Sequence, residues 1–157
     1  QGLLDCREPR IHSLIAQGKI TLHKFKGKAY FNREEIESLA RLYQDNWSME
    51  QAIVETELSR YQLKQLLDAD LISTIQRADH QNRDWLISKE KWENQIIALK
   101  KRSSNHDNGL SLCGLQKQGY NICSVILLLK TKKLSFNFSP NHEKPNSIKQ
   151  LSKFILQ

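Results

Sequence analysis

A short apolar pattern occurs twice in this chain of 157 residues, at a fixed offset of 52 residues. The first copy covers residues 11–15 and Ile20. The second covers residues 63–67 and Ile72, with apolar side chains at the matching positions. Behind each copy come a β-like run, a polar or basic tip, a second β-like run, a capping residue and an amphipathic helix. Two copies of one compact unit are the simplest explanation, because self-similarity at a fixed offset is typical of repeated structure.

A weaker third copy begins 62 residues after the second, where residues 125–129 run to Leu134. In this copy, residues 136–138 would form the first strand of a hairpin. Apolar residues then recur at a helical spacing over residues 148–156, which predicts the closing helix. The return strand of this hairpin is expected to be missing.

The three copies divide the chain into units of about 50 residues, a size at which small modules can fold. The predicted units are residues 1–46, 47–102 and 103–157. In the second unit a full helix over residues 48–58 comes before the repeated helix, whereas the same offset places its counterpart before residue 1. We therefore expect the first unit to be truncated and the chain to be a piece of a larger protein. The predicted fold class is α+β, mainly α with small β-hairpins.

The second unit contains two capping boxes in succession. Ser48 is followed by Gln51, and Ser59 by Gln62, and each pair predicts the start of a short helix. Two helices separated only by residues 56–59 form a helix-turn-helix. The leucines of the second helix would pack inward, and its outer face would be polar: Arg60, Tyr61, Gln62, Lys64 and Gln65.

A basic hairpin is predicted in the first unit. Apolar and polar residues alternate from Lys19, and the chain can turn at Lys26 and Gly27 before a second short strand and a helix capped by Asn32. Lysines within so few residues repel one another unless an anionic partner neutralises them. The hairpin of the second unit, residues 75–87, has a nearly neutral tip and should contact phosphate less strongly. The lysines at the first tip are Lys24, Lys26 and Lys28.

The formal net charge of +7 and the pI of about 9.4 meet the first test for a nucleic-acid-binding protein. Residues 1–47 carry 8 Lys and Arg against 6 Asp and Glu, residues 48–102 carry 9 against 9, and residues 103–157 carry 7 against 2. On charge alone, the two ends would contact phosphate, and the middle unit would be a spacer or a protein-binding unit.

Catalysis finds no support in the sequence, which lacks G-x-S-x-G, P-loop and H-E-x-x-H motifs. The three cysteines form no C-x-x-C pair and lie far from histidines at zinc spacing. We therefore expect no enzyme activity, metal, cofactor or small-molecule substrate.

No apolar run of about 18 residues predicts a membrane span, so a cytoplasmic, nucleoid-associated protein is expected. RNA binding is less favoured, because the sequence suggests no aromatic platform on a sheet and no G-x-x-G clamp.

The stretch from Leu3 to Leu39 resembles the excisionase and MerR-like winged helix-turn-helix family. Its members share a helix end, a capped second helix, a glycine, a short basic wing and a closing helix. In that family the second helix enters the major groove and the wing lies along the DNA backbone. The resemblance therefore implies base contacts by Arg7, Arg10 and Ser13, and phosphate contacts by the three hairpin lysines. The corresponding candidates in the later units are Arg60, Gln62 and Lys64, and a basic corner of Lys130, Lys132 and Lys133.

Arrays of such units are similar to the C-terminal part of TniQ and TnsD proteins, which choose target sites for transposons. Two functions stay open. In the first, tandem winged helix-turn-helix modules bind double-stranded DNA sequence-specifically, for transposon target-site selection or transcription regulation. In the second, the chain is an adaptor that recruits a transposase or an ATPase through Trp47, Trp85 and Trp92, with DNA contact secondary. The salt dependence of duplex binding separates the two.

Overall fold

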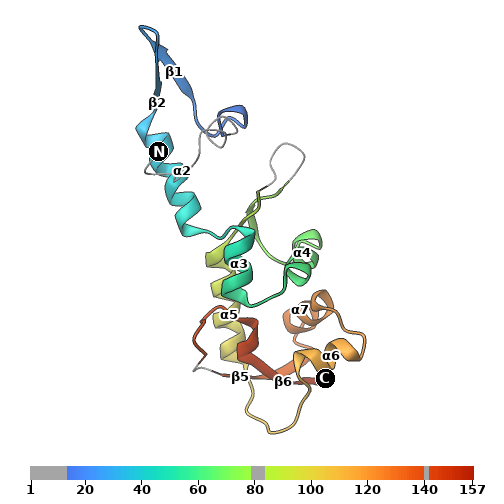
Figure 1. The fold of residues 1–157 in the computed structure, drawn as a ribbon. Coiled ribbons are helices and arrows are strands. Elements are labelled where there is room, and N and C mark those ends of the chain that lie inside the picture. The colour runs from blue at the N-terminus through green and yellow to red at the C-terminus, as the bar shows by residue number, and fades with distance from the viewer. Residues whose placement is uncertain (1–13, 79–83, 140–141) are drawn as a thin grey trace.

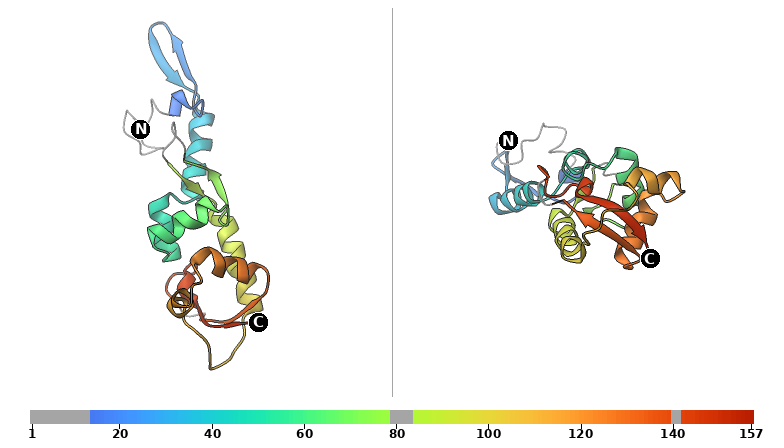
Figure 2. Two further views of the ribbon diagram at one scale, coloured as in Figure 1. Left: turned by 90° about the vertical axis from the view of Figure 1, so that its right-hand side faces the viewer. Right: turned by 90° about the horizontal axis from the view of Figure 1, so that it is seen from below.

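A computed structural model describes residues 14–78, 84–139 and 142–157. The fold is mixed α+β, as the sequence predicts, with antiparallel two-stranded sheets. Figures 1 and 2 show an elongated molecule, with the β1–β2 hairpin at one end and the β5–β6 hairpin at the other. The elements in chain order are β1 (Leu22–Phe25), β2 (Lys28–Phe31), α2 (Arg33–Asp45), α3 (Met49–Thr56), α4 (Arg60–Asp68), β3 (Thr74–Gln76), β4 (Leu86–Ile87), α5 (Lys89–Arg102), α6 (Leu112–Lys117), α7 (Ile122–Lys130), β5 (Leu134–Phe138), the 3-10 turn η1 (Ile148–Gln150) and β6 (Leu151–Leu156).

The same backbone turn ends the second helix of each predicted unit. A residue with positive φ follows the helix, and the next N–H donates to a carbonyl five residues back, which is a defining hydrogen bond of the Schellman motif. The positive-φ residues are Gly18, Asp70 and Lys132, with φ of 72°, 55° and 60°. The hydrogen bonds run from Lys19 to Leu14, from Leu71 to Leu66 and from Lys133 to Leu128, at 3.0, 2.9 and 2.9 Å. Successive turns are 52 and 62 residues apart, so the backbone repeats at the offsets of the apolar pattern.

A second repeated feature joins the residue before the first helix of a unit to the return strand of its hairpin. Trp47 and Ile87 exchange two backbone hydrogen bonds, of 3.0 and 2.7 Å. Leu110 and Phe154 exchange two bonds of 2.8 Å in the corresponding place. Residues 47–102 and 103–157 are therefore built on the same backbone pairing.

The prediction of a helix over residues 148–156 is wrong. Only η1 is helical there, and β6 is the return strand that the sequence was expected to lack, paired antiparallel with β5. A β-bulge produces the helix-like spacing of the apolar residues in this strand. The pairing register of β5 and β6 shifts where Lys153 takes a φ of 51°. One extra residue in β6 lets Leu151 and Phe154 both face the core although they are three positions apart. An apolar spacing of three is normally read as helical.

One apolar core joins the second and third units. Its buried residues run from Trp47 to Phe154, whereas Leu14, Ile20 and Leu39 form a separate, small cluster in the first unit. Helix α4 packs against α7, and α7 packs against β5. Two polar contacts cross the same boundary in the chain: the Trp92 indole N–H donates to the Asn146 carbonyl at 2.8 Å, and Arg102 donates to the Leu129 carbonyl at 2.7 Å. Residues 47–157 are thus held together by a common core.

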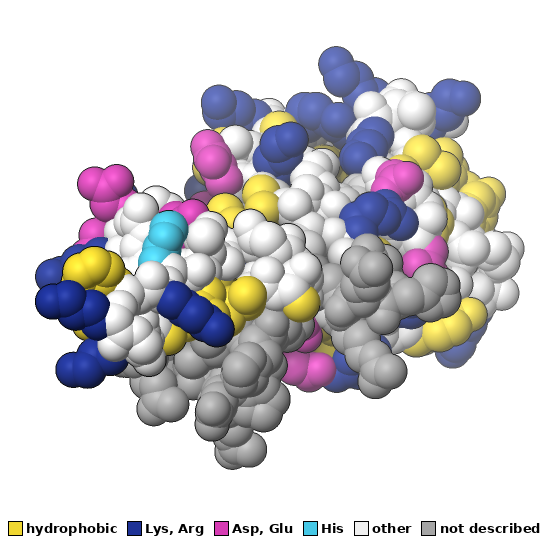
Figure 3. All heavy atoms as spheres, turned by 90° about the horizontal axis from the view of Figure 1, so that it is seen from above, with side chains coloured by type: hydrophobic (Ala, Val, Ile, Leu, Met, Phe, Trp, Pro, Cys, Tyr) yellow, Lys and Arg dark blue, Asp and Glu magenta, His cyan; other side chains and the backbone are white. Residues whose placement is uncertain are grey.

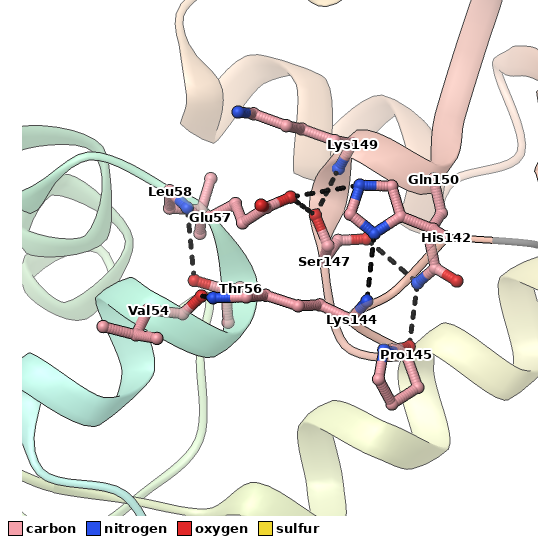
Figure 4. Close-up of polar contacts among 10 residues, drawn as sticks. All are labelled: Val54, Thr56, Glu57, Leu58, His142, Lys144, Pro145, Ser147, Lys149 and Gln150. Carbon is pink, nitrogen blue, oxygen red and sulfur yellow. Dashed lines mark hydrogen bonds and ion pairs between the residues drawn. The ribbon is translucent and has the colours of Figure 1, made fainter.

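A polar cluster fastens the segment before β6 to the turn between α3 and α4 (Figure 4). The hydroxyl of the fully buried Ser147 donates to the carboxylate of Glu57, and His142 Nε2 lies 3.3 Å from the same carboxylate. Lys144 Nζ donates to the Val54 carbonyl at 2.9 Å. Because Ser147 donates to Glu57 and not to His142, the imidazole is not placed to take the hydroxyl proton. The cluster is a fastening between two parts of the fold.

The contacts of the Glu57 carboxylate in this cluster should contribute less stability in acid. The hydrogen bond from Ser147 holds the pKa of Glu57 below its usual value of 4.5. A carboxylate whose pKa is lower in the folded state stabilises the fold above its unfolded pKa, and this contribution disappears as the pH falls through the folded pKa. Melting temperatures measured from about pH 6 down to about pH 3 should fall more steeply for the native protein than for Glu57→Gln. Glu55→Gln, two residues earlier in α3, is the control and should retain the native slope; equal slopes for the native protein and Glu57→Gln would contradict the assignment.

Candidate nucleic-acid interface

The β1–β2 hairpin projects from the end of the molecule (Figure 1), and all of its strand residues are exposed. Its strands join through Lys26 and Gly27, whose φ angles are 50° and 76°. Positive φ at both central residues is typical of the type I′ turn, which matches the twist of a two-residue hairpin. The predicted turn position is therefore confirmed, and Phe25 pairs with Lys28 across it.

The lysines of this hairpin are free to meet an anion. Lys24, Lys26 and Lys28 are exposed, and no carboxylate of the described residues lies within ion-pair distance of them. Lys26 Nζ lies 5.5 Å from the centre of the Phe25 ring. Figure 3 shows Lys and Arg side chains beside hydrophobic ones at this end of the molecule. The hairpin thus offers positive charge that the described part of the protein does not neutralise.

Helix α4 has the orientation that the sequence predicts. Ser59 and Gln62 form a capping box, with backbone-to-side-chain bonds of 3.1 and 3.0 Å, and Ser48 and Gln51 form the same box at α3. Both predicted capping boxes are confirmed. The inward leucines are fully buried, whereas Tyr61 is 74% exposed on the outer face. The buried residues are Leu63, Leu66 and Leu67.

Three polar side chains on the outer face of α4 already have partners within the protein. Arg60 forms an ion pair with Glu50 of α3, and Lys64 forms one with Asp68 at 3.7 Å. The Gln62 side chain accepts the capping hydrogen bond described above. Exposed ion pairs contribute only about 0–1 kcal/mol, so a phosphate or a base edge can compete for Arg60 and Lys64. Gln62 is less available, because its side chain is held at the start of the helix.

An open groove of about 820 Å³ lies beside α4, between that helix, the start of α3 and the segment before β4. Within it the ring of Trp85 has two cations nearby, Lys64 at 5.9 Å and Arg77 at 5.4 Å. Arg77 also pairs with Asp70. Neither Trp85 nor Arg77 was a predicted DNA-binding residue, because the sequence interpretation considered only the neutral tip of this hairpin. The sequence signal was a basic residue directly after the first strand, Arg77, and an aromatic residue directly before the second, Trp85.

The predicted basic corner follows α7. Lys132 and Lys133 are exposed, and Lys130 Nζ donates to the Leu71 carbonyl at 3.2 Å, which ties the corner to the end of α4. Helix α7 itself presents no polar outer face like that of α4, since the side chain exposed at its centre is the apolar Leu127, 49% exposed. The candidates Arg7, Arg10 and Ser13 lie outside the residues that the structure describes.

Two of the tryptophans invoked for a protein partner belong to the core. Trp47 is 5% exposed and Trp92 is 3% exposed, whereas Trp85 is half-buried beside α4.

Across residues 14–78, 84–139 and 142–157, histidine, cysteine and acidic side chains do not gather in groups of three that could hold a metal ion. Of the helices in those ranges, none has both the length and the apolar composition that crossing a bilayer requires.

Comparison of the chain with protein-family models, with curated proteins and with solved structures yields no match.

Proposed function

We propose that this chain binds double-stranded DNA sequence-specifically through tandem winged helix-turn-helix modules. The order of helix, capped second helix, left-handed turn, hairpin and closing helix over residues 47–102 supports the module assignment. The observation that carries DNA binding is the β1–β2 hairpin, an exposed element with three lysines that no described carboxylate neutralises. A polyanion is the partner that such a hairpin fits best.

The two elements would have different roles in the complex. The hairpin lysines would contact phosphates and supply affinity, because such contacts are independent of sequence. Helix α4 would enter the major groove and read base edges through Arg60 and Lys64, with Arg60 able to pair bidentately with guanine. Lys132 and Lys133 would add phosphate contacts at the far end of the molecule. Selection of transposon target sites or regulation of transcription is the role we propose for such binding.

The ion pair between Arg60 and Glu50 gives a sharp test of this proposal. Arg60→Ala should weaken binding to the preferred site by about 1–3 kcal/mol, whereas Glu50→Gln should strengthen binding because it frees Arg60 and removes a nearby negative charge. Both effects are measured by fluorescence anisotropy with a duplex of about 30 base pairs, roughly three helical turns. Glu90→Gln, on the exposed start of α5, is the control for charge and should leave binding unchanged. Affinity that is unchanged or higher in Arg60→Ala would contradict a role for α4.

The salt dependence of duplex binding tests the proposal as a whole. Binding should fall steeply between about 50 and about 200 mM salt, as it does for proteins that neutralise several phosphates. If the chain binds no duplex at the lower concentration, the adaptor function takes its place. The burial of Trp47 and Trp92 makes the adaptor the less favoured function, since two of the three side chains on which it depended are in the core.

A further inference from the structure

One face of the β1–β2 hairpin carries two exposed aromatic rings. Phe25 is 64% exposed and Tyr30 is 49% exposed. Residues that pair across an antiparallel ladder share a face, and here Phe25 pairs with Lys28 and His23 pairs with Tyr30. Alternation along each strand places these two pairs on the same side. We call these four residues, His23, Phe25, Lys28 and Tyr30, the ring face.

The ring face differs from ordinary exposed apolar surface in the charged residues that lie beside its rings. Single exposed hydrophobic residues are normal on proteins. Here two aromatic rings and an imidazole share one face with Lys28, Lys26 lies at the turn, and Lys24 points to the opposite side of the same hairpin. Flat rings next to unneutralised cations match what a single-stranded nucleic acid presents, which is a row of base faces along a phosphate backbone.

Duplex recognition does not account for this face. In a duplex the faces of the bases are stacked on one another, and proteins read the base edges and the phosphates. The hairpin lysines alone can provide the phosphate contacts of a wing. The exposed rings of Phe25 and Tyr30 are left without a role unless the bases that they meet are unpaired.

We propose that the ring face binds unpaired nucleotides, with Phe25 and Tyr30 each stacking on one base while the hairpin lysines neutralise the adjoining phosphates. The two rings are diagonal neighbours on the ladder, so bases that stack on them would belong to nearby nucleotides of one strand. The hairpin, four residues long on each side, has room for about two bases on one face. This site shares the hairpin lysines with the proposed duplex contacts and is separate from the contacts assigned to α4.

The test is binding of the whole chain to fluorescent single strands of about 15 nucleotides, dT and U homopolymers, at low salt. Phe25→Ala with Tyr30→Ala should weaken binding about 25-fold, at about 5-fold for each stacked base. Phe25→Leu with Tyr30→Leu should weaken it nearly as much, because leucine preserves the apolar area but has no ring to stack. Phe25→Trp should preserve binding. Tyr61→Ala, which removes an exposed ring from α4, is the matched control and should leave binding unchanged.

Several outcomes would overturn this proposal: no binding of the native chain to either strand at about 50 mM salt, a double leucine variant that binds as well as the native chain, or an equal loss in Tyr61→Ala. A preference for the dT or the U strand identifies the natural ligand as DNA or RNA, and either preference supports the ring face as the site. Thermal melts of each variant should match the native protein, since the substituted side chains are exposed. Arg60→Ala separates the single-strand proposal from the duplex proposal, because this variant should weaken duplex binding and leave single-strand binding intact.

Discussion

A variant with Lys24, Lys26 and Lys28 all replaced by alanine is expected to lose most of the salt dependence of duplex binding. Each phosphate contact contributes about 0.9 to the slope of log affinity against log salt, so three contacts contribute about 2.7. Between about 50 and about 200 mM salt, this part of the slope amounts to roughly 40-fold in affinity. The structure supports the size of the effect, because all three side chains are exposed and have no described carboxylate partner.

The measurement is a salt titration of duplex binding for the native chain and the triple variant. A second triple variant, with Lys91, Lys101 and Lys117 replaced by alanine, lowers the net charge equally at exposed positions on α5 and α6. This control should retain nearly the whole native slope. Equal slopes for the two triple variants would mean that total charge, and not the hairpin, determines binding.

The largest expected effect on stability is that of Phe154→Ala. Phe154 is 1% exposed in β6, and its replacement leaves a cavity that costs about 3–5 kcal/mol of unfolding free energy. Because its core also contains the leucines of α4, more than 80 positions earlier in the chain, α4 should lose protection together with β6. Urea denaturation combined with hydrogen exchange of the α4 amides measures both effects.

The neighbouring residue provides the control for this prediction. Ile155 is 38% exposed in the same strand, so Ile155→Ala should have a much smaller effect on unfolding. If Phe154→Ala loosens β5 and β6 while the α4 amides remain fully protected, residues 47–157 do not share one cooperative core.

Local signals in the sequence predicted much of this fold. The capping residues Asn32, Ser48 and Ser59 begin helices where expected, because their side chains satisfy backbone N–H groups within three residues. The turn at Lys26 and Gly27 was equally readable, since few residue pairs favour positive φ at both positions. These features depend on short-range chemistry that the sequence states directly.

Features that depend on long-range pairing were not predictable in this way. The bulge at Lys153 gives Leu151 and Phe154 a common face, so a strand has the apolar spacing of a helix. The burial of Trp47 follows from its pairing with Ile87, 40 positions away, which no local pattern reveals. The aromatic face of the hairpin was missed for a different reason: the predicted turn already implies the register that places Phe25 and Tyr30 on one side, but only the lysines were considered.

The candidate site was predicted in part. The hairpin lysines and the outer face of α4 lie on exposed elements, as expected, because charged residues at a turn and opposite buried leucines are directed to solvent. The pairing of Arg60 with Glu50 and the placing of Arg77 against Trp85 were not predicted. Both contacts join separate elements, and their geometry is determined by packing between those elements.

Selection from a random pool of duplex oligonucleotides tests the central proposal most directly. At about 50 mM salt, the native chain should enrich a defined sequence, and Arg60→Ala should relax the preference at one or two positions of that sequence. The triple lysine variant should retain the same preferred sequence with lower affinity, because phosphate contacts do not read bases. Recovery of no duplex above background, or of duplexes without any shared sequence, would contradict sequence-specific binding by this chain.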